Sequence, residues 1–124
     1  MPQRDYSAPV LAFTGDAVYS LLVREALAKT GNRSAKVLHR ASIDLVCAPA
    51  QSRVYRQLEP LLTPEERTIL RRGRNAHVSA PPQGATRVQY QEATGVECLF
   101  GWLFLTAQTQ RAREIFQLTI DNEQ

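Results

Sequence analysis

The sequence predicts an all-α fold, a compact bundle of about six helices. Apolar residues recur at helical spacing along nearly the whole chain, and no segment alternates in the manner of a strand. Helix start and stop signals divide this pattern into segments of ordinary length. With 124 residues, 44% of them hydrophobic and 22% charged, the chain is expected to form one domain over 1–124, its core at about 10–118.

The first two helices are expected over 7–31 and 32–48. Ser7 suits the N-cap of the first helix, because its hydroxyl can accept from a free backbone N–H. The second helix has Asn32 or Ser34 in the same role. Its inward face is expected to consist of Val37, Leu38, Ala41, Leu45 and Cys47.

The third and fourth helices are separated by a clear start signal. Residues 50–62 follow the helix-breaking Pro49 and form the third helix. Thr63 and Glu66 then have the spacing of a capping box, in which each side chain bonds the other residue's backbone N–H. Gly73 is expected to end the fourth helix.

The last two helices follow a loop over 76–86, where two prolines and a glycine forbid regular structure. The fifth helix is expected from about Val88 to Ala107, and the sixth over 109–120. The fifth is apolar around its whole circumference, so it is expected at the centre of the bundle.

The distribution of charge favours a polyanionic partner. Between Lys29 and Arg74 the chain carries ten Lys or Arg and four acidic residues, a net +6, whereas the remainder carries −3. The N-terminus lacks the apolar stretch of a signal peptide, and no run is long enough to span a membrane. Cys47 and Cys98 have no metal-binding spacing and are expected to be free thiols, which suits the cytoplasm.

Two acidic residues lie on the two most apolar helices. Glu97 is the only charged residue between Glu92 and Arg111, and Asp16 has no basic residue one turn away. Each has a glycine nearby on its helix, Gly15 beside Asp16 and Gly101 one turn beyond Glu97. Because the two most buried helices of a small bundle should touch, we expect the two carboxylates to meet.

Three partners could satisfy two carboxylates that meet in this way. A basic side chain such as Arg24 or Lys36 could pair with them, the two could share a proton, or they could bind a divalent cation. Mg²⁺ fits the last case, because it uses one or two protein carboxylates and completes its shell with waters and phosphate.

A second group of candidate residues is basic. Arginines near a helix end can simply complement the helix dipole, but guanidinium groups also match phosphate geometry. Without a row of aromatic residues for base stacking, such a surface suits a duplex bound through its backbone. The candidate RNA-binding residues are Lys36, Arg40, Arg71, Arg72, Arg74 and Asn75.

Four segments, in order, resemble the ribonuclease III catalytic-domain family and especially its compact branch, Mini-ribonuclease III. They are "LAFTGDAVYSLLVR", "LHRASIDLVCAPAQ", "RRGRNAH" and "YQEATGVECLFGWLFL". The similarity extends from about Val10 to Leu118. By motif position, Asp16 and Glu97 correspond to the catalytic, metal-binding acids of the family. Ala12 and Thr94 stand where full-length ribonuclease III carries two more acids, as in the compact branch.

The resemblance implies a homodimeric, Mg²⁺-dependent endoribonuclease that cuts double-stranded RNA and leaves 5′-phosphate and 3′-hydroxyl ends. It also implies a role in maturation of ribosomal RNA precursors, notably of the large subunit. The fifth helix is expected to line the dimer interface. Because no separate double-stranded RNA-binding domain is expected, a helper such as a ribosomal protein could assist binding.

Two other functions are compatible with parts of the pattern. A non-catalytic helical RNA-binding or assembly factor would use the same basic residues and would pair Asp16 and Glu97 with arginines. A DNA-binding helix-turn-helix protein is less consistent with the sequence, because no short turn precedes an exposed recognition helix.

Overall fold

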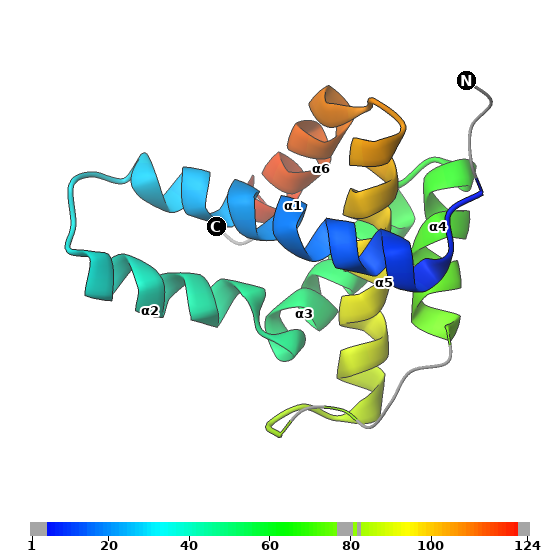
Figure 1. The fold of residues 1–124 in the computed structure, drawn as a ribbon, viewed down its shortest axis with the longest axis horizontal. Helices are drawn as coiled ribbons and strands as arrows, with labels where there is room; N and C mark the ends of the chain where they lie inside the picture. Colours follow the sequence, from blue (N-terminus) through cyan, green and yellow to red (C-terminus); the bar gives the residue numbers. More distant parts are fainter. Residues whose placement is uncertain (1–4, 77–80, 82, 122–124) are drawn as a thin grey trace.

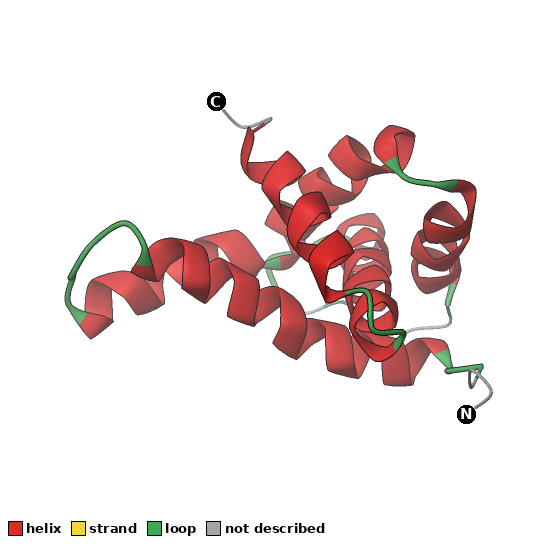
Figure 2. Cartoon of the chain, turned by 90° about the horizontal axis from the view of Figure 1, so that it is seen from above, coloured by secondary structure: helices red, strands yellow, loops and turns green. Residues whose placement is uncertain are grey.

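The computed structural model describes residues 5–76, 81 and 83–121, so much of the loop expected over 76–86 lies outside the described residues. The described chain is helical, as predicted, and contains no strand (Figure 2). None of its helices is long and apolar enough to cross a membrane. The elements are α1 Ala8–Ala28, α2 Ala35–Val46, α3 Ala48–Leu58, the 3-10 helix η1 Glu59–Leu61, α4 Pro64–Asn75, α5 Arg87–Leu105 and α6 Thr109–Asp121.

Helix α5 is the centre of the bundle and packs most extensively against α1, α3 and α4 (Figure 1). Burying one large apolar side chain contributes roughly 1.5–3 kcal/mol, so this helix dominates the core. Tyr19 of α1 packs edge-on against Phe100 and Phe116, with ring centroids 5.1 and 5.6 Å apart. The core side chains with no exposed surface include Leu58, Leu70, Val96, Leu99, Phe100, Leu103 and Ile115.

The predicted N-caps of the first, second and fourth helices are confirmed, whereas α3 begins at Ala48, two residues before its predicted start, with Pro49 in its first turn. Ser7 and Ser34 accept from the backbone N–H three residues on, so Ser34 rather than Asn32 caps α2. In the capping box of α4, the Glu66 N–H donates to Thr63 at 3.2 Å, and the Thr63 N–H donates to Glu66 at 2.9 Å. A second capping box, formed by Thr86 and Gln89 at the start of α5, was not predicted.

Gly73 does not end α4, and that prediction is wrong. The helix continues to Asn75, and Gly73 is buried against α5. A β-carbon added to Gly73 would lie 2.8 Å from the β-carbon of Cys98 and from the α-carbon of Gly95. This glycine therefore serves close helix packing instead of a left-handed terminus.

The predicted inward face of α2 is also wrong. Val37 and Leu45 are exposed, Leu38, Ala41 and Cys47 are half-buried, and Ser42 is the one fully buried residue of α2. The physical reason is that α2 packs mainly against α1, with a small contact to α3, and lies to one side of the other helices (Figure 1). One neighbouring helix can cover only a narrow stripe of α2.

A buried ion pair attaches α6 to the start of α4. The Arg111 guanidinium donates to both carboxylate oxygens of Glu66, at 2.7 and 2.9 Å. This pairing outweighs burial and lowers the pKa of Glu66 below its usual range. Cys47 and Cys98 are both free thiols, as predicted.

Candidate active site

Helices α1 and α5 cross with their backbones in contact at two glycines. A β-carbon added to Gly15 would lie 1.6 Å from the carbonyl oxygen of Glu97, and one added to Gly101 would lie 2.0 Å from that of Leu11. Backbones approach this closely only where neither helix has a side chain in the way. The crossing explains why each acid has a glycine near it on its helix.

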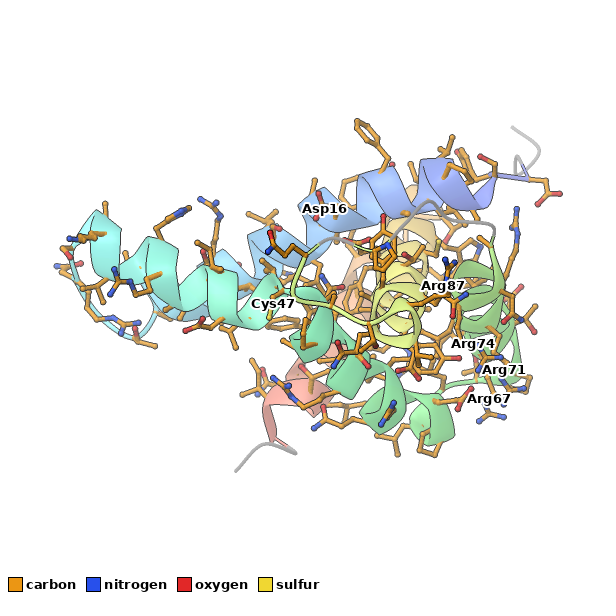
Figure 3. All side chains as sticks on the ribbon, turned by 90° about the horizontal axis from the view of Figure 1, so that it is seen from below. Asp16, Cys47, Arg67, Arg71, Arg74 and Arg87 are labelled. Atoms are coloured by element: carbon orange, nitrogen blue, oxygen red, sulfur yellow. The ribbon has the colours of Figure 1, made fainter. Side chains whose placement is uncertain are left out.

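The crossing brings Asp16 and Glu97 together, as the sequence predicted. The neighbour of Asp16, Gly15, lies against the backbone of Glu97, and Asp16 is close enough to raise the pKa of the Glu97 carboxyl group. The Asp16 side chain is exposed and that of Glu97 is half-buried, so solvent reaches the pair through Asp16. Figure 3 shows Asp16 on α1 with its side chain outside the core.

The surroundings of Glu97 disfavour its charged form. Burial raises the pKa of Glu97 to about 8, and the negative charge and hydrogen bond of Asp16 add to this effect. A hydrogen bond to Gln51 acts in the opposite direction and lowers the pKa. Without a cation, Glu97 is therefore mostly protonated at neutral pH.

A basic partner, the first alternative, is not found for these acids. Within the described residues, the ion pairs join other carboxylates to Arg56, Arg71, Arg72, Arg111 and Arg113, and none of these pairs includes Asp16 or Glu97. Of the three predicted alternatives for Asp16 and Glu97, a shared proton and a divalent cation therefore remain.

The donor set fits Mg²⁺. Two carboxylates in contact, one of them exposed, can bind a hard cation and leave most of its coordination shell to water or a phosphate. Among the described residues no third His, Cys, Asp or Glu joins the pair, so a closed site of the structural-zinc type does not fit.

Three arginines lie on one face of α4, four and three residues apart: Arg67, Arg71 and Arg74. Figure 3 shows the three of them along α4. The Arg71 side chain donates to Glu59 at 2.9 Å, and the guanidinium of Arg74 lies 5.6 Å from the ring centre of Tyr55. Because the Arg71 pair is exposed, it contributes at most about 1 kcal/mol and leaves Arg71 available to a phosphate.

Arg72 lies apart from this group. One residue further along α4, it points to another side, donates to the carbonyl of Tyr6 at 2.5 Å, and lies 3.7 Å from Asp5. Its contacts hold the segment that leads into α1. Asn75 is exposed, and its side-chain oxygen accepts from Arg74 at 3.1 Å.

The other predicted basic residues, Lys36 and Arg40, are exposed on α2. They lie one turn apart on α2, which is far from α4 and its arginines (Figure 1). Neither of them forms an ion pair with a described residue.

A family model described as "Ribonuclease III domain" matches residues 9–108. The match spans most of the chain and contains both acids. The chain belongs to the ribonuclease III domain family. Membership of this family makes it a nuclease domain of the hydrolase class.

Curated relatives within the ribonuclease III domain family carry the name Mini-ribonuclease 3. One from Thermoanaerobacter sp. is 39% identical over 90% of this chain and 78% of its own length. One from Symbiobacterium thermophilum is 40% identical over 90% and 85%, and one from Enterococcus faecalis is 36% identical over 94% and 92%. A crystal structure of a Fusobacterium nucleatum protein superposes with a TM-score of 0.87, at 30% identity, covering 98% of this chain and 97% of that one.

At the two positions where full-length ribonuclease III carries further acids, this ribonuclease III domain has none. Ala12 is half-buried on α1, and Thr94 is buried, its hydroxyl donating to the Tyr90 carbonyl one turn back at 2.9 Å. Neither residue contributes a carboxylate to the site.

Sequence reasoning missed two residues of this region. Arg67 could have been found, because its spacing to Arg71 and Arg74 puts all three on one helical face. Its guanidinium donates to the carbonyls of Glu59 and Leu62, at 3.0 and 3.1 Å, so it joins α4 to the segment before it. Gln51 resembles any polar helical residue in the sequence, yet it is buried and lowers the pKa of Glu97.

Proposed function

We propose that this protein is an endoribonuclease that cleaves double-stranded RNA by Mg²⁺-dependent hydrolysis of phosphodiester bonds. The observation that carries the proposal is the proximity of Asp16 and Glu97, two carboxyl groups that form no ion pair with a described basic residue. Membership of the ribonuclease III domain family supports it.

Asp16 and Glu97 are the proposed catalytic and metal-binding residues. When bound, Mg²⁺ would lower the pKa of a coordinated water and offset the charge that develops on the phosphate. Because Asp16 is exposed, a phosphate can approach the site from solvent, whereas Glu97 is half-buried. Water attacks phosphorus, the bond to the 3′ oxygen breaks, and the products are a 5′-phosphate and a 3′-hydroxyl.

The proposed RNA-binding residues contact the duplex through its backbone. Arg71 and Arg74 are the best supported, because they share one face of α4, on which Arg71 is exposed and Arg74 is half-buried. Guanidinium groups in such a row can each contact a phosphate of one strand. Lys36 and Arg40 of α2, Arg72 and Asn75 complete the set.

A homodimer is part of the proposal. Val10, Phe13 and Leu21 form an exposed apolar stripe along one face of α1, and Phe13 is 83% exposed. Leu21 and the exposed Phe104 of α5 line one small pocket, so the stripe continues onto α5. Contiguous exposed apolar surface of this kind favours association. The interface we propose is therefore centred on α1, with α5 at its edge, and two sites could act on the two strands across one groove.

The proposed natural substrate is a ribosomal RNA precursor, notably of the large subunit, processed in the cytoplasm. The name Mini-ribonuclease 3 of the relatives supports a role as a nuclease without identifying the RNA. Incubating the protein with precursor and mature ribosomal RNA and mapping the ends would identify it. Repeating the reaction with large-subunit ribosomal proteins would reveal a helper.

The substitution Glu97→Gln tests the proposed chemistry, because it keeps the side-chain volume and removes the charge. Cleavage of duplex RNA in Mg²⁺ should fall by at least about 100-fold, while binding of the duplex without metal should stay within about threefold. Glu92→Gln is the control, since Glu92 is bound to Ser52 and Arg56 instead. Full cleavage by a folded Glu97→Gln protein would refute the assignment, and a parent protein that binds but never cuts would indicate an assembly factor.

A further inference from the structure

The arginines of α4 and α6 differ in how much of the guanidinium group is already bonded. Arg67 and Arg111 each donate through Nε and Nη2 at once, so their guanidinium groups serve the fold. Arg71 donates only through Nε, to the Glu59 carboxylate at 2.9 Å, and its two terminal amino groups have no bond to a described residue. Those two groups form the edge of a guanidinium that can bind a phosphate through parallel hydrogen bonds.

Glu59, the partner of Arg71, is itself fixed at both its backbone and its side chain. Its carbonyl accepts from Nε of Arg67 at 3.0 Å. Its Oε2 accepts from the hydroxyl of Tyr55 at 3.3 Å, and the same oxygen accepts from Arg71. The hydrogen bond from Arg71 lowers the pKa of Glu59 below its usual range, so the carboxylate is ionised at neutral pH. Arg71 is therefore bonded to an acceptor whose place is determined by the fold.

Tyr55 connects this arrangement to the core. It is 2% exposed, and a β-carbon added to Gly95 of α5 would lie 3.1 Å from its ring. Burial raises the pKa of Tyr55 to about 12, so its hydroxyl keeps the proton that it donates. The guanidinium of Arg74 lies 5.6 Å from the centre of the same ring. One buried tyrosine thus supports two neighbouring arginines, Arg74 through its ring and Arg71 through Glu59.

We propose that Glu59 is a positioning residue, which holds Arg71 by its Nε so that the two terminal amino groups are presented to a phosphate of the RNA backbone. This inference rests on the proposed function, in which Arg71 and Arg74 bind the duplex. An arginine that the protein has already ordered loses less conformational entropy on binding, and ordering one long side chain lowers affinity by about 2- to 10-fold. Glu59 therefore strengthens RNA binding, although its charge has the same sign as that of the RNA.

A purely electrostatic role for Glu59 gives the opposite result. Its negative charge repels phosphate and offsets that of Arg71, so removing the charge would tighten binding. Glu59→Met and Glu59→Gln remove the same charge at similar side-chain length. Only the glutamine keeps an oxygen that can accept from Arg71 and Tyr55. The two substitutions therefore separate the effect of geometry from the effect of charge.

The experiment measures binding of a fluorescent duplex RNA by anisotropy, in EDTA and at fixed salt, while thermal unfolding monitors the fold. We expect the Kd of Glu59→Met to rise by about 5-fold and that of Glu59→Gln to stay within about twofold of the parent. Glu65→Met is the matched control, because Glu65 is an exposed acid of α4 that forms no ion pair with a described residue. It should bind the duplex at least as tightly as the parent.

A double-mutant cycle tests whether Glu59 acts through Arg71. Arg71→Ala should raise the Kd by about 10-fold, the effect of one charge-assisted contact, and adding Glu59→Met to it should cause no further weakening. Equal losses from Glu59→Met with and without Arg71 would overturn the inference. Tighter binding by both Glu59 variants would also overturn it, because charge alone would then explain the result.

If Glu59→Met does not fold, Tyr55→Phe replaces it in the cycle. This change keeps the ring beside Arg74 and removes only the hydroxyl that holds Glu59, so its effect should likewise vanish in the Arg71→Ala background. A parent that binds no duplex RNA, or an Arg71→Ala protein that binds like the parent, refutes the proposed role of Arg71 in RNA binding. A weakened Arg71→Ala beside an unaffected Glu59→Met refutes only the role of Glu59.

Discussion

Burial and Asp16 both favour the protonated form of Glu97, whereas arginine partners lower the pKa of Glu25, Glu59 and Glu66. A group whose pKa is higher in the folded than in the unfolded state stabilises the fold at low pH. That stabilisation is lost as the pH rises through the folded-state pKa, here from about 4.5 to about 8. The acid pair thus makes stability depend on pH near neutrality, where few side chains titrate.

We therefore predict that the parent loses stability relative to Glu97→Gln as the pH rises from 5 to 9 without metal. The loss should be on the order of 2 kcal/mol, since partial exposure screens the pair. Chemical denaturation in EDTA at several pH values measures it. Saturating Mg²⁺ should remove most of the difference in slope, because the bound cation keeps both acids ionised. Parallel pH profiles for the two proteins would contradict the raised pKa.

At the scale of single residues, the sequence was sufficient to predict that Asp16 and Glu97 meet. It was not sufficient to predict that Gln51 is buried. An isolated charge in an apolar helix needs a partner, and that requirement can be deduced from composition and spacing alone. Glutamine is acceptable in almost any helical position. Its burial beside Glu97 depends on where α2 ends and α3 begins, which is a property of the tertiary structure.

At the scale of the helix, Gly101 within α5 and Ala107 just after it occupy positions that both favour glycine, but for different reasons. Gly101 needs the space that a β-carbon would fill, since Leu11 of α1 is in contact with it. Ala107, just past the end of α5, has φ 61°, where glycine is preferred. The Gln108 N–H donates to the Leu103 carbonyl at 2.7 Å, which is typical of a helix end of this kind.

Gly101→Ala should therefore destabilise the protein by about 3 kcal/mol, the upper part of the range for overpacked sites. It should also weaken Mg²⁺ binding, because α1 must move away from α5. Ala107→Gly is the reverse exchange and should stabilise the fold by about 1 kcal/mol with no effect on the metal. Urea denaturation and Mg²⁺ titration measure both variants. A neutral Gly101→Ala would be inconsistent with the observed backbone contact.

The helix starts were predictable because capping is local, requiring a side chain and an N–H only three residues apart. The predicted end of α4 at Gly73 was wrong because glycine has two uses. It can terminate a helix or allow another helix to approach, and only the position of α5 distinguishes them.

At the scale of the whole molecule, the apolar stripe of α1 formed by Val10, Phe13 and Leu21 is exposed in the single chain. We predict that Phe13→Ser weakens dimerisation by at least about 30-fold, as expected of a central interface residue. Val88→Ser, at another exposed apolar position on the first turn of α5, is the control and should leave the dimer intact. Sedimentation velocity over a range of concentrations measures both. A parent that remains monomeric at every concentration would exclude this interface.

The fold class and the central position of α5 followed from periodicity, which reports how much of each helix is covered. Periodicity does not show which neighbouring helix packs on an apolar face, or how much of that face the neighbour buries. Helix α2 has an amphipathic pattern like its neighbours, but it lies to one side of the other helices, and much of its apolar face is exposed.

The glycine crossing has a consequence for how tightly the spacing of the acids is controlled. Where main chains meet directly, the gap between two helices depends on peptide geometry, which is stiff, and very little on rotamers, which vary. Substitutions elsewhere in the interior can therefore rearrange side chains without moving Asp16 relative to Glu97. The spacing that metal binding and RNA cleavage require can therefore be kept while the surrounding hydrophobic residues change.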